Sequence, residues 1–281
     1  MALVSVVMPV FNGAEVLREQ LISLVHQDFR SPWELIAADN GSSDASLEVI
    51  DEFAEELPLR IIDASTRSGN AAARNLGAAA ATGDLILFCD QDDAVDPHWI
   101  SSHLACLSDA DISIGPYEMR TDMAMVESGS YVSVPMRGTY GFLPYGLSAN
   151  MGIRRSTFDV LGGFDEMYPA ACDVDICWRA QLQGLALGVT EDAVVTKRKR
   201  HRAGDVWRQH YTFGCDDVRL YSNFRRHGMP RSLPLAVKTY SWLLVHTPYL
   251  VHHERRLHWI GVAGQRMGRF AGSIRNRLFF F

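Results

Sequence analysis

Short apolar runs alternate with helix-spaced apolar patterns through roughly the first 115 residues of the chain. The short apolar runs have the length of strands and cover 3–10, 34–38, 59–63 and 85–89. Between them, apolar residues recur every three or four positions, over 14–26, 44–56, 70–81 and 97–107. This alternation predicts βα units built around a mainly parallel sheet.

The pattern becomes looser in the second half of the chain. We predict extended segments at 111–117, 148–153 and 186–200, and helices at 173–183 and 206–226. Residues 120–146 are rich in Gly, Pro, Ser and Tyr, which predicts a loop that covers a pocket. The predicted fold is α/β, with a single mainly parallel mixed sheet flanked by helices and a helical C-terminal extension.

Charge divides the chain into an acidic body and a basic tail. The whole chain of 281 residues carries −6. Residues 231–281 hold eight Lys or Arg and one Glu, a net +7, which leaves −13 on residues 1–230. We expect one domain over 1–230, divided into halves at 1–118 and 119–230, and a separate tail over 231–281. The acidic body argues against nucleic-acid binding.

The basic tail is also rich in aromatic residues, and two interpretations of it stay open. Its aromatic and Arg residues fit a segment that rests on an anionic membrane surface. A helical extension that packs on the body or forms a dimer fits equally well, because amphipathic stripes are usually buried. The apolar stretch 233–251 contains Pro234, Lys238 and Pro248, which does not suit a membrane span.

The cysteines and the N-terminal segment indicate a cytoplasmic protein, peripheral on the membrane if the tail binds lipid. The five cysteines are odd in number and form no Cys-x-x-Cys pair, which is typical of reduced, buried thiols. The apolar run 3–10 has no basic leader, so no signal peptide is predicted.

The segment with the clearest chemistry is Asp90-Gln91-Asp92-Asp93, directly after the predicted strand 85–89. Carboxylates this close repel one another unless a cation neutralises them. Mg²⁺ and Mn²⁺ bind carboxylate oxygens together with substrate phosphates. Open α/β sheets also bind their ligands at the carboxyl edge, where this segment lies.

Two further polar residues fall at the same predicted edge, and each has a structural alternative. Asp39 ends the second strand, where it suits a hydrogen bond to a ribose or base edge; Asp-Asn-Gly-Ser is also good turn chemistry. Arg74 lies early in an apolar helix, within reach of a phosphate, but it also fits an arginine that extends from a half-buried face.

The second half adds another candidate acid and a basic run. Asp173 is expected at a helix N-terminus, either as a functional carboxylate or as a helix cap. Asp175 and Arg179 are spaced as a structural ion pair. The run 197–202 is either a solvated charged strand or a clamp on a diphosphate, with His201 as a possible metal ligand.

These segments together resemble the family 2 glycosyltransferases, which have the GT-A fold and invert the anomeric carbon. The resemblance spans roughly residues 3–184, and no Walker loop or Gly-x-Gly-x-x-Gly fingerprint competes with it. The matching segments appear in the family's order: Val7–Asn12, Ala38–Asp44, Gly69–Asn75 with Gly77, Asp90–Asp93, Gly162–Glu166 and Asp173–Arg179.

The resemblance implies a nucleoside diphosphate sugar as donor and Mg²⁺ or Mn²⁺ as cofactor. It implies that the metal is bound by Asp92 and that Asp173 is the general base that deprotonates the acceptor hydroxyl. The residues that it assigns to the nucleotide sugar are Pro9, Val10, Phe11, Asp39, Arg74 and Asp90. The acceptor is not identified, and a glycan, a lipid-linked acceptor and a small molecule all stay open.

Two departures from the family pattern leave other functions open. Cys172 stands where the family usually has Glu, and Asn40 replaces a common second Asp. No Gln-x-x-Arg-Trp motif is present, which argues against a processive synthase. A sugar-phosphate nucleotidyltransferase and a catalytically silent nucleotide-sugar-binding protein are the alternatives.

Overall fold

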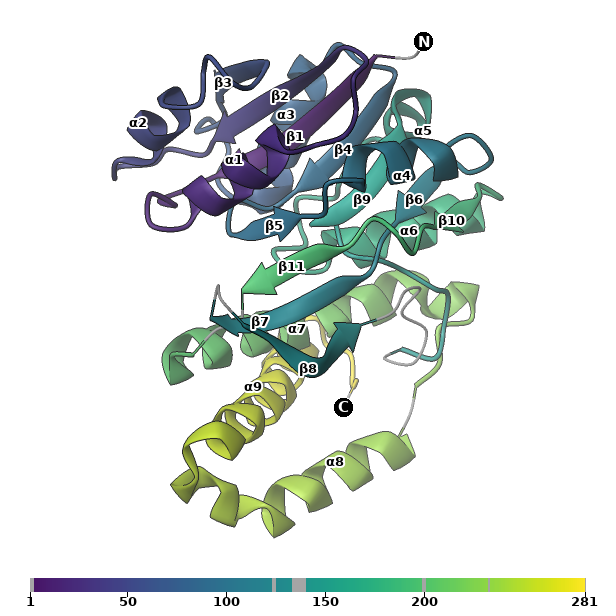
Figure 1. Cartoon of the computed structure of the whole chain (residues 1–281). Coiled ribbons are helices and arrows are strands. Elements are labelled where there is room, and N and C mark those ends of the chain that lie inside the picture. Colours follow the sequence, from purple (N-terminus) through teal and green to yellow (C-terminus); the bar gives the residue numbers. More distant parts are fainter. Residues whose placement is uncertain (1–2, 123–124, 133–139, 199–200, 232, 281) are drawn as a thin grey trace. The chain divides into compact units, whose positions relative to one another are not determined.

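A computed structural model describes residues 3–122, 125–132, 140–198, 201–231 and 233–280 (Figure 1). The chain divides into two compact units. The first comprises Met1–Met136, Pro144–Met167 and Cys172–Lys199. The second comprises Arg137–Leu143, Tyr168–Ala171 and Arg200–Phe281. The predicted functional division at 118 and 230 stays a prediction.

The first unit is built on a seven-stranded mixed sheet with the order β10-β6-β9-β4-β1-β2-β3. All neighbouring strands in it are parallel except β9, which runs antiparallel to both β4 and β6. The mainly parallel mixed sheet of the prediction is thereby confirmed. The strands are β1 (Val4–Val10), β2 (Trp33–Asp39), β3 (Leu59–Asp63), β4 (Leu85–Cys89), β6 (Ile112–Ile114), β9 (Asn150–Arg154) and β10 (Leu187–Val189).

A second sheet of four strands, in the order β5-β11-β7-β8, was not anticipated from the sequence. Its strands are β5 (Asp93–Val95), β7 (Tyr117–Asp122), β8 (Met125–Val132) and β11 (Val195–Arg198). The prediction of a continuous loop over 120–146 is therefore wrong for β8 and the end of β7. Glycine and serine in β8 hide the alternation of a strand, and pairing with β7 supplies the order instead.

Helices cover both faces of the main sheet. The alternate residues Val4, Val6, Met8 and Val10 of β1 pack in one core cluster with apolar side chains of α1, α2 and α4. On the opposite face α3 contacts β1 and β2. The helices of this unit are α1 (Leu17–Val25), α2 (Ser46–Asp51), α3 (Asn70–Ala80), α4 (Trp99–Cys106), α5 (Arg155–Leu161) and α6 (Cys172–Leu182).

Gly77 explains how closely α3 approaches the sheet. A Cβ at this position would lie 2.4 Å from Val7 Cγ1, too close for any side chain without a shift of the helix. The alanines of α3 complete this small interface, with Ala73 packed against Ala38 and Ala64. The close packing fixes Arg74, on the same helix, at the carboxyl edge of the sheet.

A buried polar network joins α4 to β6 and β9. His103 is fully buried, with Nδ1 2.9 Å from Ser113 Oγ and Nε2 2.9 Å from Asn150 Oδ1. Asn150 Oδ1 can only accept, so Nε2 carries the proton, and the lowered pKa leaves Nδ1 unprotonated to accept from the Ser113 hydroxyl. Trp99 Nε1 donates to the same Oδ1 at 2.8 Å. Burial lowers the pKa of His103 to about 4.

The neutral state of His103 predicts a loss of stability in mild acid. Unfolded histidine titrates near 6.5, so between about pH 6.5 and 4 the unfolded chain binds the extra proton and gains about 3 kcal/mol relative to the folded chain. We expect the free energy of unfolding, measured with urea from pH 7.5 to 4.5, to fall more steeply in the wild type than in His103→Gln. Parallel curves for the two proteins would contradict this assignment.

The second unit is helical within the described residues. Its helices are α7 (Ala203–Phe224), η1 (Arg225–His227), α8 (Leu233–Val245), η2 (Thr247–Val251) and α9 (His253–Arg275). The helices α7 and α9 pack along each other with their backbones in close contact. A Cβ on Gly214 would lie 2.1 Å from Gln265 O, and one on Gly268 would lie 2.1 Å from Tyr211 O.

Part of the basic tail packs inside this unit. Arg269 Nε donates to Asp217 Oδ2 at 2.7 Å, and both side chains are buried. The Phe280 ring stacks on Tyr221 at 4.6 Å. The interpretation of the tail as a packed extension therefore holds for α9. Among the helices that the structure describes, none combines the length and apolar character that crossing a bilayer requires.

Candidate active site

The carboxyl ends of β1 and β2 lie side by side, because Val10 pairs with Asp39 at the last position of both strands. The loops that follow are tied together. Asn12 Oδ1 accepts from the Ser43 N–H at 2.8 Å, and the Asn12 N–H donates to Ser42 Oγ at 3.1 Å. Asp39 in turn accepts from the Ser42 N–H at 3.1 Å. The edge is thus a network of linked loops.

Gln91 joins the first of these loops to the acidic turn after β4. The Phe11 N–H donates to Gln91 Oε1 at 2.9 Å, and Gln91 Nε2 donates to Phe11 O at 3.0 Å. A Cβ on Gly13 would lie 2.5 Å from the same amide, so only glycine leaves room for it. The Phe11 side chain is 55% exposed at this edge.

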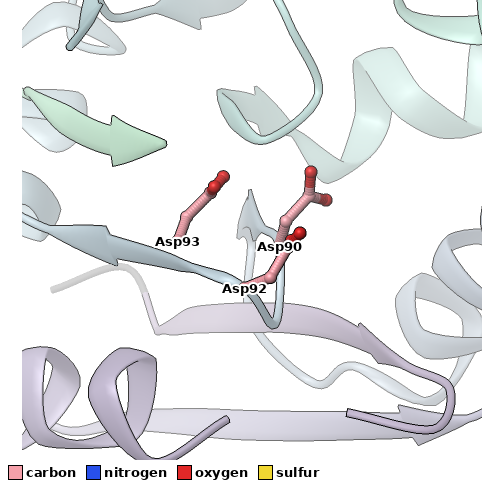
Figure 2. A group of neighbouring side chains, drawn as sticks. All are labelled: Asp90, Asp92 and Asp93. Atoms are coloured by element: carbon pink, nitrogen blue, oxygen red, sulfur yellow. The ribbon is translucent and has the colours of Figure 1, made fainter. Parts of the chain in front are cut away.

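The carboxylates of Asp90, Asp92 and Asp93 gather at the turn between β4 and β5. Figure 2 shows all three extending to the same side of this turn. One oxygen from each lies within 4.8 Å of the others, which is close enough for a single cation to contact all three. Carboxylate oxygens are the ligands that Mg²⁺ and Mn²⁺ prefer.

Two basic side chains neutralise part of this cluster. Arg74 pairs with Asp90, and the Arg74 side chain is only 3% exposed. Lys197 Nζ lies 2.5 Å from Asp93 and 3.4 Å from Asp90. The pairing of β5 with β11 places Lys197 directly opposite Asp93. Within the described residues, Asp92 has no ion pair and is the carboxylate left for a cation.

The pKa values follow from burial and these charges. Burial would raise the pKa of Asp90, but Arg74 and Lys197 outweigh it and hold that pKa below its usual value. Asp93 is 3% exposed, and burial raises its pKa to about 7 against the opposing effect of Lys197. Lys197 shows a raised pKa, because Asp93 and Asp90 outweigh its own burial.

Asp173 lies in the first turn of α6, next to the same charges. Its carboxylate accepts from the Val174 N–H at 2.8 Å and from the Ser148 N–H at 3.3 Å. Burial raises its pKa, with these two hydrogen bonds and Arg74 in opposition and Asp90 adding to the rise. A buried carboxylate with a raised pKa accepts a proton more readily than an exposed one.

The residues on either side of Asp173 in α6, Cys172 and Asp175, add no unpaired charge to the site. Cys172, in place of the family's usual Glu, is buried, and burial raises the pKa of its thiol to about 12. Asp175 accepts from Arg179 Nε at 2.7 Å, which confirms the predicted ion pair. Arg179 also bonds to the carbonyl oxygens of Leu161 and Gly163. Asp175 is therefore structural, and Asp173 is the carboxylate left for chemistry.

The structure gathers most of the predicted site residues in the first unit. Pro9 and Val10 end β1, and Asp39 ends β2. His201 belongs to the second unit, and its role as a metal ligand stays a prediction. In the basic run, Lys197 pairs with Asp93 and Asp90 and is therefore not simply solvated, and residues 199 and 200 lie outside the described residues.

The contacts of three side chains at the site were not predicted from the sequence. Lys197 and Gln91 contact the acidic turn, and Tyr117 interacts electrostatically with both Lys197 and Asp173. Burial raises the pKa of Tyr117. Lys197 reaches the acidic turn because β11 pairs antiparallel with β5. The two paired residues are about a hundred positions apart, so no local pattern in the sequence indicates this contact.

The Gly162–Glu166 motif has a structural role at the start of α3. The Asn75 amide donates to Phe164 O and to Glu166 Oε1, each at 2.9 Å, and accepts from the Phe164 N–H at 2.9 Å. Arg67 pairs with the same Glu166 at 2.6 Å. These bonds hold the motif against the helix that carries Arg74.

Solved structures with similar folds define the class. A mannosyltransferase, PcManGT of Pyrobaculum calidifontis, in complex with GDP-Man and Mn²⁺, matches with a TM-score of 0.67 at 18% identity, over 96% of this chain and 87% of that one. Residues 1–349 of Staphylococcus aureus TarS in complex with UDP-GlcNAc match with a TM-score of 0.60 at 19% identity, over 98% and 92%. The fold is the GT-A nucleotide-diphospho-sugar transferase fold.

Residues 5–163 match the model of the family "Glycosyl transferase family 2", and the chain belongs to this family of transferases. The glycosyltransferase AglE of Haloferax volcanii is 24% identical over 86% of this chain and 80% of its own length. An uncharacterized glycosyltransferase of Haemophilus influenzae is 38% identical over 34% of this chain, and the match spans only 38% of that relative.

Proposed function

We propose that the chain transfers a sugar from a nucleoside diphosphate sugar to an acceptor hydroxyl, with inversion at the anomeric carbon. The observation that carries this proposal is the joint placement of Asp92, Asp173 and Arg74 around one edge of the sheet. The two similar structures are complexes with nucleotide sugars, UDP-GlcNAc and GDP-Man. These complexes support a nucleotide sugar as the donor of this chain.

The chain's own groups suit a single displacement. The acceptor oxygen bonds to the anomeric carbon as the bond from that carbon to the diphosphate oxygen breaks, and the acceptor proton passes to Asp173. Burial of Asp173 supports this role, because it raises the carboxylate's affinity for the proton. No covalent intermediate is needed, so one base is enough.

Arg74 and the linked loops suit the donor. Arg74 Nε is buried and has no hydrogen-bond partner within the described residues, so it has a donor to offer to a ligand oxygen. Val10, Phe11 and Asp39 would border the base and ribose, with Asp90 on the ribose side. Phe11 is exposed and suits a stacking contact with a base.

The acidic cluster suits Mg²⁺ or Mn²⁺, bound chiefly by Asp92. Arg74 and Lys197 already neutralise Asp90 and Asp93, so the cluster offers a cation about one full negative charge. A bound divalent cation would stabilise the charge that develops on the diphosphate leaving group.

The five free cysteines support a reducing, cytoplasmic location.

A thermal-shift panel tests the donor and metal roles. With Mn²⁺ and UDP or GDP at a hundred times Kd, the folded state gains about 2.7 kcal/mol, so the Tm rises. We expect Asp92→Ala to abolish this rise and Asp109→Ala, at an exposed aspartate outside the cluster, to keep it. An equal rise in Asp92→Ala would remove Asp92 from the metal site.

The reaction products distinguish the proposed transferase from the alternatives. A glycosyltransferase releases a nucleoside diphosphate, whereas a nucleotidyltransferase releases pyrophosphate from a nucleoside triphosphate. Two parallel incubations with Mn²⁺, one with nucleotide sugars and one with a nucleoside triphosphate plus a sugar 1-phosphate, followed by chromatography of the products, separate the two. Release of neither product over a broad donor panel would favour a silent binding protein.

A further inference from the structure

The outer face of α8 and η2 carries a row of exposed apolar side chains. Val237 is 67% exposed, Leu244 78% and Val251 84%. Tyr240 and Leu244 follow Val237 by three and seven positions, so these three residues share one face of α8. Val245, 72% exposed, adjoins them. We call these five residues the α8–η2 face.

The α8–η2 face is distinct from the side of α8 that packs inside the unit. Trp259 Nε1 donates to Leu243 O at 3.0 Å, and Arg266 donates to Thr239 Oγ1 at 3.1 Å. Ala236 is buried, and the Trp242 ring contacts His258 edge-on at 5.1 Å. The inner face thus packs on α9. The segment η2 connects α8 to α9 along the chain (Figure 1).

The part of the chain that carries the α8–η2 face is strongly basic. Residues 200–281 contain 14 Lys or Arg and four acids, a net +10, which leaves −16 on residues 1–199. Two of the four acids, Asp216 and Asp217, are fully buried and therefore do not offset charge at the surface. Arg231, Lys238 and Arg255 are exposed along the same segment.

We propose that the α8–η2 face docks on an anionic lipid bilayer. Its apolar side chains would enter the region between headgroups and acyl chains, while Lys238, Arg231 and Arg255 contact anionic headgroups. Charge complementarity favours a bilayer over a second copy of the chain. Two such faces in contact would bring their cations together, whereas anionic headgroups supply the opposite charge.

Co-sedimentation of the full chain with vesicles tests the proposal. Vesicles of phosphatidylcholine alone are compared with vesicles that contain about a third phosphatidylglycerol. We expect binding about tenfold stronger to the anionic vesicles, and a loss of that binding in 0.5 M salt (about a 4 Å screening length). Equal binding to both vesicle types would overturn the proposal.

Variants locate the contact. Leu244→Asp combined with Val251→Asp places two charges on the α8–η2 face, and we expect binding to anionic vesicles to fall about tenfold. Val160→Asp is the matched control, because Val160 is 70% exposed on α5, and it should bind like the wild type. Wild-type binding by the double variant would overturn the proposal.

Sedimentation velocity without lipid tests the competing occupant. We expect the wild type and the double variant to have the same oligomeric state. A wild-type dimer that the double variant converts to a monomer would assign the face to a second copy of the chain and overturn the membrane proposal. We expect the circular dichroism spectrum of the double variant to match that of the wild type. The loss of vesicle binding would then come from the changed surface and not from unfolding.

Discussion

Asp173→Asn is expected to lower kcat for sugar transfer by about 10³-fold, because general-base catalysis contributes roughly 10² to 10⁴. Asparagine has the same shape and keeps one oxygen, which can accept from the Val174 N–H as Oδ1 does, while its amide nitrogen takes the place of the Oδ2 that accepts from the Ser148 N–H at 3.3 Å. It cannot accept the acceptor's proton. Measured with nucleotide release at saturating donor, KM for the donor should change little, since the loss lies in the chemical step.

Folding is not expected to suffer in the same variant. Burial raises the pKa of Asp173, so the ionised carboxylate lowers the stability of the folded state above its unfolded pKa. This gain offsets the loss of the bond from the Ser148 N–H to Oδ2, so at neutral pH Asp173→Asn should be about as stable as the wild type. The acidic limb of the pH–rate profile should lie above the usual aspartate range in the wild type and be absent from the variant.

Asp175→Asn is the matched control for this loss. Asp175 is 2% exposed on the same helix, but its carboxylate is held by Arg179. We expect kcat to stay within about threefold of the wild type, since no acid–base role is removed. Near-normal turnover in Asp173→Asn would exclude Asp173 as the base, and equal losses in both variants would indicate disruption of α6 instead.

Arg74→Met is expected to lower the free energy of unfolding by about 3 kcal/mol, because it leaves the partly buried Asp90 carboxylate with only its longer contact to Lys197. The Arg74 side chain is 3% exposed and pairs with Asp90. After the substitution Lys197, 3.4 Å away, is the cation that still contacts Asp90 within the described residues. Donor binding should weaken as well. Urea unfolding and donor titration measure the two effects.

The double variant Arg74→Met with Asp90→Asn separates charge from packing. Removing both charges should restore a large part of the lost stability, since the uncompensated carboxylate is gone. Arg67→Met is the surface control: its pair with Glu166 is half-exposed, and its loss should cost about 1 kcal/mol or less. A loss of that small size in Arg74→Met would show that its ion pair is not important for the fold.

The sequence predicts the part of the fold that local patterns determine. The strands β1 to β4 are short, mainly apolar runs, and α3 and α6 have helical spacing, so each can be predicted from its own segment. The second sheet depends on pairing between β5, β7 and β11, which are short and distant in sequence. The extended segment predicted at 186–200 contains β11, but a local pattern does not report its pairing with β5 and β7.

The candidate site shows the same limit. The carboxylates of Asp90 and Asp173 could be identified from their positions after a strand and at a helix start. Their partners could not, because Arg74 and Lys197 reach the turn from α3 and β11, 16 and 107 residues away from Asp90. Which charges neutralise one another is a property of the assembled sheets.

The amide of Gln91 has one more consequence, under the proposed function. It bonds to both backbone groups of Phe11 while its own backbone lies between Asp90 and Asp92. A nucleotide base that displaces Phe11 would therefore also displace the turn that carries Asp92. Donor recognition and placement of the diphosphate anchor would then be a single mechanical event.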